Sequence, residues 1–357
     1  MHELSKFQEP ASGQAREAVS MLSTLRERLA GGLSALSGTP ASSLEVARWL
    51  RDAGQHGGGD RVLLGPAEGF CTASLNISQV HYDDLPDRRL GSATALSCIV
   101  HPTVPEAPSM HMHLSWTEMK GAEASGSWRL MADLNPSHEV VEDTAQFRAA
   151  MEAACGDEAD EARARGDAYF HIPALQRHRG AAHYYFERHR GVSLDQGRED
   201  ARRFGEAAVD TYVSLLRAHM LDASGALRSP VDASDASALQ QRAYHTLYLY
   251  QVLTLDRGTT SGVLVHDQND EGILGSLPPV VDVALLRTWR AMTPAPQDKL
   301  LDQICEVLDV EPVGVVDGTR KRSLAGVLRQ HYAANPEGLK LQAGDPAAPL
   351  AAQRHRD

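Results

Sequence analysis

The sequence predicts an α+β fold that combines a large, mostly antiparallel β-sheet with helices. The centre of the sequence holds short apolar or alternating segments separated by Gly, Pro and Asn, which is typical of strands joined by turns. On either side of this centre, apolar residues recur three and four positions apart, as on one face of a helix. The short connections favour antiparallel pairing, because a parallel pair needs a long crossover.

The N-terminal region is expected to begin with a long amphipathic helix. Apolar residues recur at helical spacing over residues 15–36, and Gly38 and Pro40 follow as stop signals. A short second helix is expected over residues 44–50. The three glycines at 57–59 lack the Lys-Ser/Thr of a phosphate-binding P-loop and precede a strand, so we interpret them as a flexible loop.

The predicted strands follow one another along the chain and form a meander. They cover residues 61–82, as two strands with a turn at Gly65 and Pro66, and then residues 95–100, 110–116 and 126–134. The segment between the third and fourth of these strands is rich in proline, and Asn135 and Pro136 close the last one. We therefore expect the sheet to lie at the centre of the protein.

The second half of the chain is predicted to be mainly helical. The expected helices cover residues 142–168 with a break near Gly156, 197–220, 280–289 and 296–308. A surface loop is expected over residues 224–238, and the aromatic stretch 243–262 is expected to carry a strand into a turn. We expect a single domain over residues 1–334 and a loose tail over residues 335–357.

The composition excludes several classes of protein. The chain has 357 residues, of which 42% are hydrophobic, and this is enough for a large core. Its formal net charge of -12 and its scattered basic residues argue against a nucleic-acid partner. Its four cysteines lie far apart without a CxxC pair, which favours reduced thiols. It has no apolar signal segment and no run of the roughly 20 apolar residues that a membrane span needs, so we expect a soluble, cytoplasmic protein.

Three histidines mark the best candidate for a chemical site. His111 and His113 are two positions apart on a predicted strand, so their side chains share one face of the sheet. His101 ends the preceding strand, and the proline-rich turn can bring it back toward them. Such a cluster could transfer protons or bind a metal ion, whereas the alternative is a set of hydrogen-bonded structural histidines.

Several segments, taken in order, resemble the oxygen-dependent coproporphyrinogen III oxidase family. They are GGGDRVLLGPAEGFCTASLNISQVH, LSCIVHPTVPEAPSMHMH, ADLNP, AYFHIPALQRHRGAAHYYFE, LDRGTTSG and GILGSLPP. The resemblance covers residues 22–308. It implies a single α+β domain whose sheet has helices on both faces, and a homodimer. It also implies that molecular oxygen, as co-substrate, oxidatively decarboxylates two propionates of a reduced tetrapyrrole to vinyl groups, without a required metal, flavin or haem.

The resemblance also implies the residues that act in this reaction. A base or an anion near the pyrrole nitrogen is needed to make the ring electron-rich. His111 matches the best candidate for proton transfer, and His101, Asp133 and Glu187 complete the expected catalytic set. Asp133 could instead simply close its turn.

The expected substrate-binding residues come from three segments. They are Ser97, His113, Arg179, Gly180, His171 and His178. Arg179 would grip a propionate through both guanidinium nitrogens. His171 and His178 are expected to substitute for a family histidine that aligns with Ala174. Asp256 and Arg257 match a further family turn, where we interpret Arg257 as part of a turn-stabilising ion pair.

The chain departs from the family where substrate should bind. His113 and Ser115 stand where the family has Asn and then Arg, so one cation is lost. Ala182 and His183 replace two glycines and add bulk. The segment HDQNDEG at 266–272 replaces a family loop that carries a second arginine. If these groups face the site, binding of a tetra-anionic tetrapyrrole should weaken by several kcal/mol.

Three functions are compatible with the sequence. One is a related oxidase that uses the same oxygen chemistry on a smaller or less anionic pyrrole-type substrate, repurposed from haem biosynthesis for specialised metabolism. The second is a genuine coproporphyrinogen III oxidase, and the third is a non-catalytic tetrapyrrole-binding protein. As an alternative to metal-free chemistry, His111 and His113, with His101 or Asp133, could hold a divalent metal such as iron.

Overall fold

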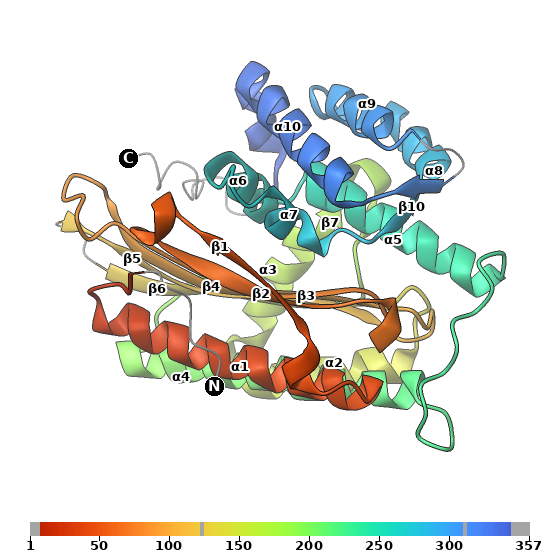
Figure 1. Ribbon diagram of the computed structural model, residues 1–357, viewed down its shortest axis with the longest axis horizontal. Coiled ribbons are helices and arrows are strands. Elements are labelled where there is room, and N and C mark those ends of the chain that lie inside the picture. The colour runs from red at the N-terminus through yellow and green to blue at the C-terminus, as the bar shows by residue number, and fades with distance from the viewer. Residues whose placement is uncertain (1–7, 122–124, 310–312, 344–357) are drawn as a thin grey trace.

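A seven-stranded antiparallel sheet forms the centre of the protein (Figure 1). The structure is a computed structural model that describes residues 8–121, 125–309 and 313–343. The strands of the sheet, in spatial order, are β1 (Glu45–Leu50), β2 (Gly57–Leu64), β3 (Phe70–His81), β4 (Leu90–Pro102), β5 (Ser109–Met119), β6 (Ser125–Asn135) and β9 (Ala182–His189). Every neighbouring pair is antiparallel, which confirms the predicted meander.

Helices from the first part of the chain cover one face of the sheet, the lower face in Figure 1. They are α1 (Gly13–Ser37), α2 (Val141–Cys155) and α4 (Leu194–Met220), while α3 (Ala159–Phe170) packs against β9. Their apolar stripes and the sheet enclose the larger hydrophobic core. The predicted helix over 15–36 is confirmed as α1, which Ser12 caps and which ends at Gly38 with φ 69°.

Helices from the last third of the chain cover the opposite face and enclose a second core (Figure 1). They are α5 (Ala236–Thr254), α6 (Arg257–Val265), α7 (Asp270–Ile273), α8 (Val283–Thr288), α9 (Gln297–Val307) and α10 (Gly318–Ala334). Two small sheets pair β7 (His171–Ile172) with β8 (Arg177–His178), and β10 (Val280–Asp282) with β11 (Val313–Val315). Short 3₁₀ helices include η7 (Leu274–Ser276) and η9 (Pro336–Leu341). The α+β fold with helices on both faces is thus confirmed.

The alternation of side chains along the strands separates the larger core from a polar face. In β4, Leu96, Cys98 and Val100 point into the core shared with α1 and α4. The residues between them, such as Ser97 and Ile99, point to the opposite face, toward α5 and α6. A strand can therefore contribute packing residues and site residues at the same time.

Two predictions near the N-terminus were wrong. Residues 44–50 were expected to be a helix, but residues 45–50 form the edge strand β1. The glycines at 57–59 were expected to be a loop, but they begin β2. A Cβ on Gly57 would lie 2.1 Å from the carbonyl oxygen of Gln79, and one on Gly58 would lie 2.5 Å from that of Trp49. Glycine is needed there because neighbouring strands approach closely.

The aromatic stretch 243–262 was also predicted wrongly. It forms most of α5 and the beginning of α6 instead of a strand and a turn. Residues 244–254 of α5 are all buried, so no polar face reveals the helical period in the sequence. Burial between the sheet and the outer helices overrides the β-propensity of the tyrosines.

The beginning of the expected loose tail is ordered. Residues 336–341 form η9, and the Ala343 amide donates to the carbonyl oxygen of Leu255 at 2.8 Å. The buried side chain of Gln342 donates to the Tyr332 hydroxyl at 2.9 Å. The rest of that tail lies outside the described residues. No helix in the described ranges is long and apolar enough to cross a membrane.

Candidate active site

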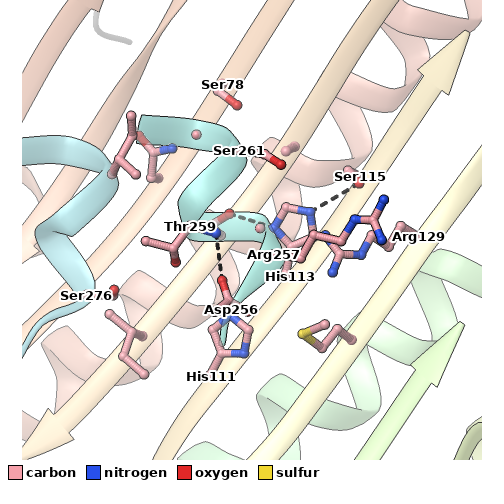
Figure 2. Close-up of a pocket in the computed structure, with 18 of the residues that line it drawn as sticks. Ser78, His111, His113, Ser115, Arg129, Asp256, Arg257, Thr259, Ser261 and Ser276 are labelled. Atoms are coloured by element: carbon pink, nitrogen blue, oxygen red, sulfur yellow. Dashed lines mark hydrogen bonds between the residues drawn. The ribbon is translucent and has the colours of Figure 1, made fainter. Parts of the chain in front are cut away.

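A cavity of about 310 Å³ lies between the polar face of the sheet and the helices α5, α6 and α7. Its floor is built from strands β3 to β6, and its roof from residues 256–276. Figure 2 shows His111, His113 and Arg129 at the floor, with Asp256, Arg257 and Thr259 of the α6 region close to them. Chain segments more than 100 positions apart therefore meet around one enclosed space.

The floor of the cavity consists largely of small side chains on adjacent strands. These are Ser74, Ser78, Ala93, Ala95, Ser97, Ser115, Thr117 and Ser127. These short side chains leave open space on the sheet beside the larger floor residues His111, His113 and Arg129. Such a space suits a flat ring system lying parallel to the sheet.

The strand register pairs His111 with Asp133 at one end of this floor. His111 Nδ1 lies 2.7 Å from Asp133 Oδ1, and the His111 side chain is 19% exposed whereas that of Asp133 is fully buried. Burial alone would raise the pKa of the Asp133 carboxyl, but the Arg179 guanidinium and the hydrogen bonds from His111 and Asn135 hold it well below its usual range. The carboxylate therefore accepts the Nδ1 proton of His111 and leaves Nε2 for proton exchange.

Arg179 orients Asp133, although the sequence predicted that it grips the substrate. Its Nη2 donates to Asp133 Oδ2 and its Nη1 to Gln251 Oε1, each at 2.7 Å. The residue is 1% exposed, and its guanidinium lies over the rings of Phe170 and Tyr248 at 4.4 and 4.7 Å. With both terminal nitrogens engaged, Arg179 contacts the edge of the cavity but is not free to clamp a propionate.

Gly180, the other half of the expected Arg-Gly pair, does not line the cavity. Its φ is +83°, and a Cβ there would lie 2.6 Å from Asn135 Oδ1 and 2.7 Å from the carbonyl oxygen of Leu134. Its role is to let the backbone turn tightly after Arg179. The sequence predicted that Gly180 contacts substrate, and the structure places it outside the cavity.

His101 is not part of the cavity, although it lies on the same face of the sheet as His111. It is fully buried beside Tyr244, His245 and Tyr248, which α5 places over it. Its Nε2 donates to the carbonyl oxygen of Ser276 at 3.3 Å, and its Nδ1 accepts from the Ser109 hydroxyl at 2.9 Å. Burial lowers the pKa of His101 well below its usual value, so it stays neutral. The structural interpretation of His101 is the better one.

His113 and Ser97 line the cavity as a hydrogen-bonded pair. His113 Nδ1 lies 2.7 Å from the Ser97 hydroxyl and Nε2 lies 3.1 Å from the Ser115 hydroxyl. Burial and the nearby Arg129 lower the pKa of His113 to about 3. Both ring nitrogens are occupied by hydroxyls. Within the described ranges, no three His, Cys, Asp or Glu side chains are grouped to hold a metal ion.

Arg129 lines the cavity and was missed in the sequence. It lies in β6, directly opposite Ser115 of β5. Its Nε donates to the Tyr185 hydroxyl and its Nη2 to the Tyr169 hydroxyl, each at 3.2 Å. Glu187, expected to be catalytic, also lines the cavity, with Oε2 3.9 Å from Arg129 Nε. Strand periodicity could have indicated Arg129, since it is four residues before Asp133 and so shares its face.

Asp256 connects this part of the floor to the roof. One of its carboxylate oxygens accepts from the Tyr169 hydroxyl and the other from the Thr259 amide, each at 2.6 Å. The second bond caps α6 at its N-terminus. The turn that resembled the family therefore fixes the roof of the cavity above Arg129.

The remaining predicted residues lie away from the cavity. His171 and His178 pack on each other with ring centroids 5.1 Å apart, and His178 is exposed. His183 is buried, and its Nε2 donates to the carbonyl oxygen of Arg179 at 2.6 Å. None of these three histidines lines the cavity. The sequence predicted that His171 and His178 bind substrate and that His183 adds bulk beside it, and the structure places all three outside the cavity.

The acidic segment 266–272 adds no carboxylate to the cavity. Asp270 pairs with Arg329, and Glu271 pairs with Arg322, both in α10. His266, Asn269 and Gly272 are the residues of this segment that line the cavity. This segment therefore places no carboxylate against the space for substrate, although the arginine of the family loop is still missing.

Comparison with known proteins places the chain in a family. The family model described as coproporphyrinogen III oxidase matches residues 17–307. The mitochondrial oxygen-dependent coproporphyrinogen-III oxidase of Rattus norvegicus is 28% identical over 295 residues, which cover 75% of this chain and 62% of the rat protein. That of Homo sapiens is 25% identical over 295 residues, covering 75% of this chain and 60% of the human protein.

A bacterial relative matches over most of its own length. The oxygen-dependent coproporphyrinogen-III oxidase of Rickettsia akari is 27% identical over 259 residues, which cover 67% of this chain and 86% of that protein. The family match extends over the sheet, the helices of the lower face and the roof of the cavity. The chain therefore belongs to the coproporphyrinogen III oxidase family, as a divergent member.

Proposed function

We propose that this chain is an oxygen-dependent oxidoreductase that oxidatively decarboxylates an electron-rich pyrrole-type substrate without a required metal or organic cofactor. The observation that carries the proposal is the connected set of His111, Asp133 and Arg179 at the edge of a cavity whose floor has many small side chains. The family membership supports the reaction type.

His111 acts as the proton-transfer group in this proposal. Asp133 accepts from Nδ1 and fixes the ring, so that Nε2 takes the proton of the pyrrole nitrogen. Loss of that proton makes the ring more electron-rich and easier to oxidise by molecular oxygen. Conversion of one propionic acid side chain to a vinyl group releases CO₂ and two electrons, and these electrons with two protons reduce one O₂ to H₂O₂. The buried Arg179 keeps Asp133 charged throughout.

We further propose that the substrate carries fewer carboxylates than coproporphyrinogen III. The cavity is lined by Arg129, Arg179 and Arg257, and Arg179 is already paired with Asp133. Glu187 and Asp256 offset the other two charges. A site without surplus positive charge is poorly suited to four carboxylates.

A genuine coproporphyrinogen III oxidase is the second candidate, because the His111–Asp133 pair and the family match are compatible with it. The chain spans about 62% of the length of the rat relative, so its activity cannot be transferred from that protein directly. A non-catalytic tetrapyrrole-binding protein is the third candidate. It is less well supported, because a carrier has no need for a proton-transfer histidine.

The deciding experiment measures oxygen consumption by the purified full chain with coproporphyrinogen III and, separately, with pyrroles and indoles that bear one carboxylate. Anaerobic reactions serve as controls, and chromatography identifies the products. Turnover of the small substrates alone supports the altered oxidase, whereas protoporphyrinogen formation supports the second candidate. Tight binding of the tetrapyrrole without oxygen uptake would point to the carrier.

We also propose a homodimer in the cytosol. The family resemblance supports the dimer, which sedimentation velocity would measure. The four cysteines are all free thiols, which supports a reducing compartment.

A further inference from the structure

We propose that Arg129 is a substrate-specificity residue that anchors one carboxylate, so that the substrate is a monocarboxylate whose acid group lies away from the ring nitrogen that meets His111. This inference rests on the proposed function, because it names the substrate class of the same cavity. It does not depend on which product is formed.

The surroundings of Arg129 fix the guanidinium, and the nearest carboxylate, that of Glu187, offsets its charge without accepting a hydrogen bond from it. Its two hydrogen bonds go to the uncharged hydroxyls of Tyr169 and Tyr185, whose rings also lie within 5.6 and 5.3 Å of the guanidinium carbon. The third nitrogen, Nη1, donates no hydrogen bond to a residue in the described ranges. The Arg129 side chain is 21% exposed and lines the cavity.

The nearby carboxylates do not occupy this donor. Glu187 lies 3.9 Å from Nε, which is too long for a hydrogen bond. Asp256 has both oxygens engaged, by the Tyr169 hydroxyl and by the Thr259 amide. The absence of a Cβ at Gly258 also keeps the space beside Nη1 open, since a Cβ there would lie 3.5 Å from that atom. A carboxylate from the substrate would complete the coordination of Arg129.

The strand register sets the distance between the anchor and the proton-transfer group. Arg129 and Asp133 are four residues apart on β6, and their partners Ser115 and His111 are four apart on β5. At about 3.4 Å per residue, the two positions are separated by about 14 Å along the strands. The floor of small side chains runs beside both, so one flat substrate can meet Arg129 with its acid group and His111 with its ring.

Other cations near the cavity are not available in the same way. Arg179 is committed to Asp133 and Gln251. Arg61 is 8% exposed and lies behind Gly272, where a Cβ would come within 2.2 Å of its Nη1. Arg257 also lines the cavity, but it belongs to the roof, at the start of α6. The loss of the family arginine at the position of Ser115 is thus compensated from the opposite strand, by Arg129.

The test compares two probes that differ only in charge, indole-3-propionate and indole-3-propionamide. Their dissociation constants are measured by titration calorimetry with the purified full chain and with R129Q, R129K and R188Q. Arg188 is exposed on β9 and lies outside the cavity, so R188Q is the matched control for loss of one positive charge. The wild type should prefer the acid over the amide roughly 10- to 100-fold.

In R129Q the ratio of the dissociation constants of the amide and the acid should fall to about one. In R129K part of the preference for the acid should remain, and R188Q should show the same ratio as the wild type. The R129K protein keeps the test decisive if R129Q does not fold. A preference that survives in R129Q overturns the inference, as does failure of both probes to bind the wild type. If the preference depends on Arg129 but no oxygen is consumed with any substrate, the inference stands and the proposed oxidase function fails.

Discussion

Replacing Asp133 with asparagine separates the role of the carboxylate in stability from its role in proton transfer. Three donors converge on Asp133, namely His111 on Oδ1 and Arg179 and Asn135 on Oδ2. An asparagine has one acceptor oxygen, and the two donors at Oδ2 will take it. Its amide NH₂ then faces His111 Nδ1, which must become an acceptor.

The expected effect on activity follows from the tautomer. With its proton moved to Nε2, His111 can no longer accept a proton from the substrate, so kcat should fall by about 10²–10⁴-fold. The expected effect on stability follows from Arg179, which remains buried without its anion. Breaking a buried ion pair in this way costs about 3–5 kcal/mol of unfolding free energy.

Urea unfolding and oxygen consumption measure the two effects separately. The double variant D133N/R179M, which removes the buried charge, should recover at least about 2 kcal/mol of stability without recovering activity. A D133N protein that retains full activity would refute the assigned tautomer. One that unfolds at the same urea concentration as the wild type would refute the importance of the buried pair.

The remaining predictions concern the same region. H111A should abolish oxygen consumption while keeping the urea midpoint within about 1 kcal/mol of the wild type, and measurable turnover would remove His111 from the mechanism. G180A should lower stability by about 1–3 kcal/mol, seen as a lower Tm, because the positive φ and the contact with Asn135 exclude a Cβ. Burial lowers the pKa of His245 to about 3. Below pH 6.5 the folded protein therefore binds fewer protons at His245 than the unfolded protein does, so the free energy of unfolding decreases as the pH falls. Between pH 7 and pH 5 the decrease in unfolding free energy due to His245 is about 2 kcal/mol. In urea unfolding at several pH values, the unfolding free energy of H245Q should therefore depend less on pH than that of the wild type.

The sequence predicted the faces of the strands but not what covers them. The two-residue period placed Ser97, His111 and His113 on one face, and the structure brings all three to the cavity. His101 has the same period but is covered by Tyr244 and Tyr248, and nothing in its own strand indicates this. The covering helix is encoded about 140 positions later, in a stretch whose uniform burial hides its helical period.

Arg179 shows the same limit for charged residues. Its position was correct, but its role depends on Asp133 and Gln251, which are 46 and 72 positions away. Distant partners decide whether a cation beside a cavity binds substrate or a buried carboxylate, and a local sequence pattern does not contain those partners. Arg129 was missed, although its spacing of four residues from Asp133 places both side chains on the same face of β6.

The order of strands in the sheet has a consequence for how the protein folds. From β1 to β6 each strand pairs with its immediate successor in the chain, so this part of the sheet can form by successive hairpins with short loop closures. Strand β9 follows α2 and α3 in the chain, and α5 to α7 follow later still. During synthesis the platform that carries His111 can therefore assemble while the segment that encloses it is still emerging from the ribosome. We expect the transition state for folding to contain the hairpins, and the enclosed cavity to form last.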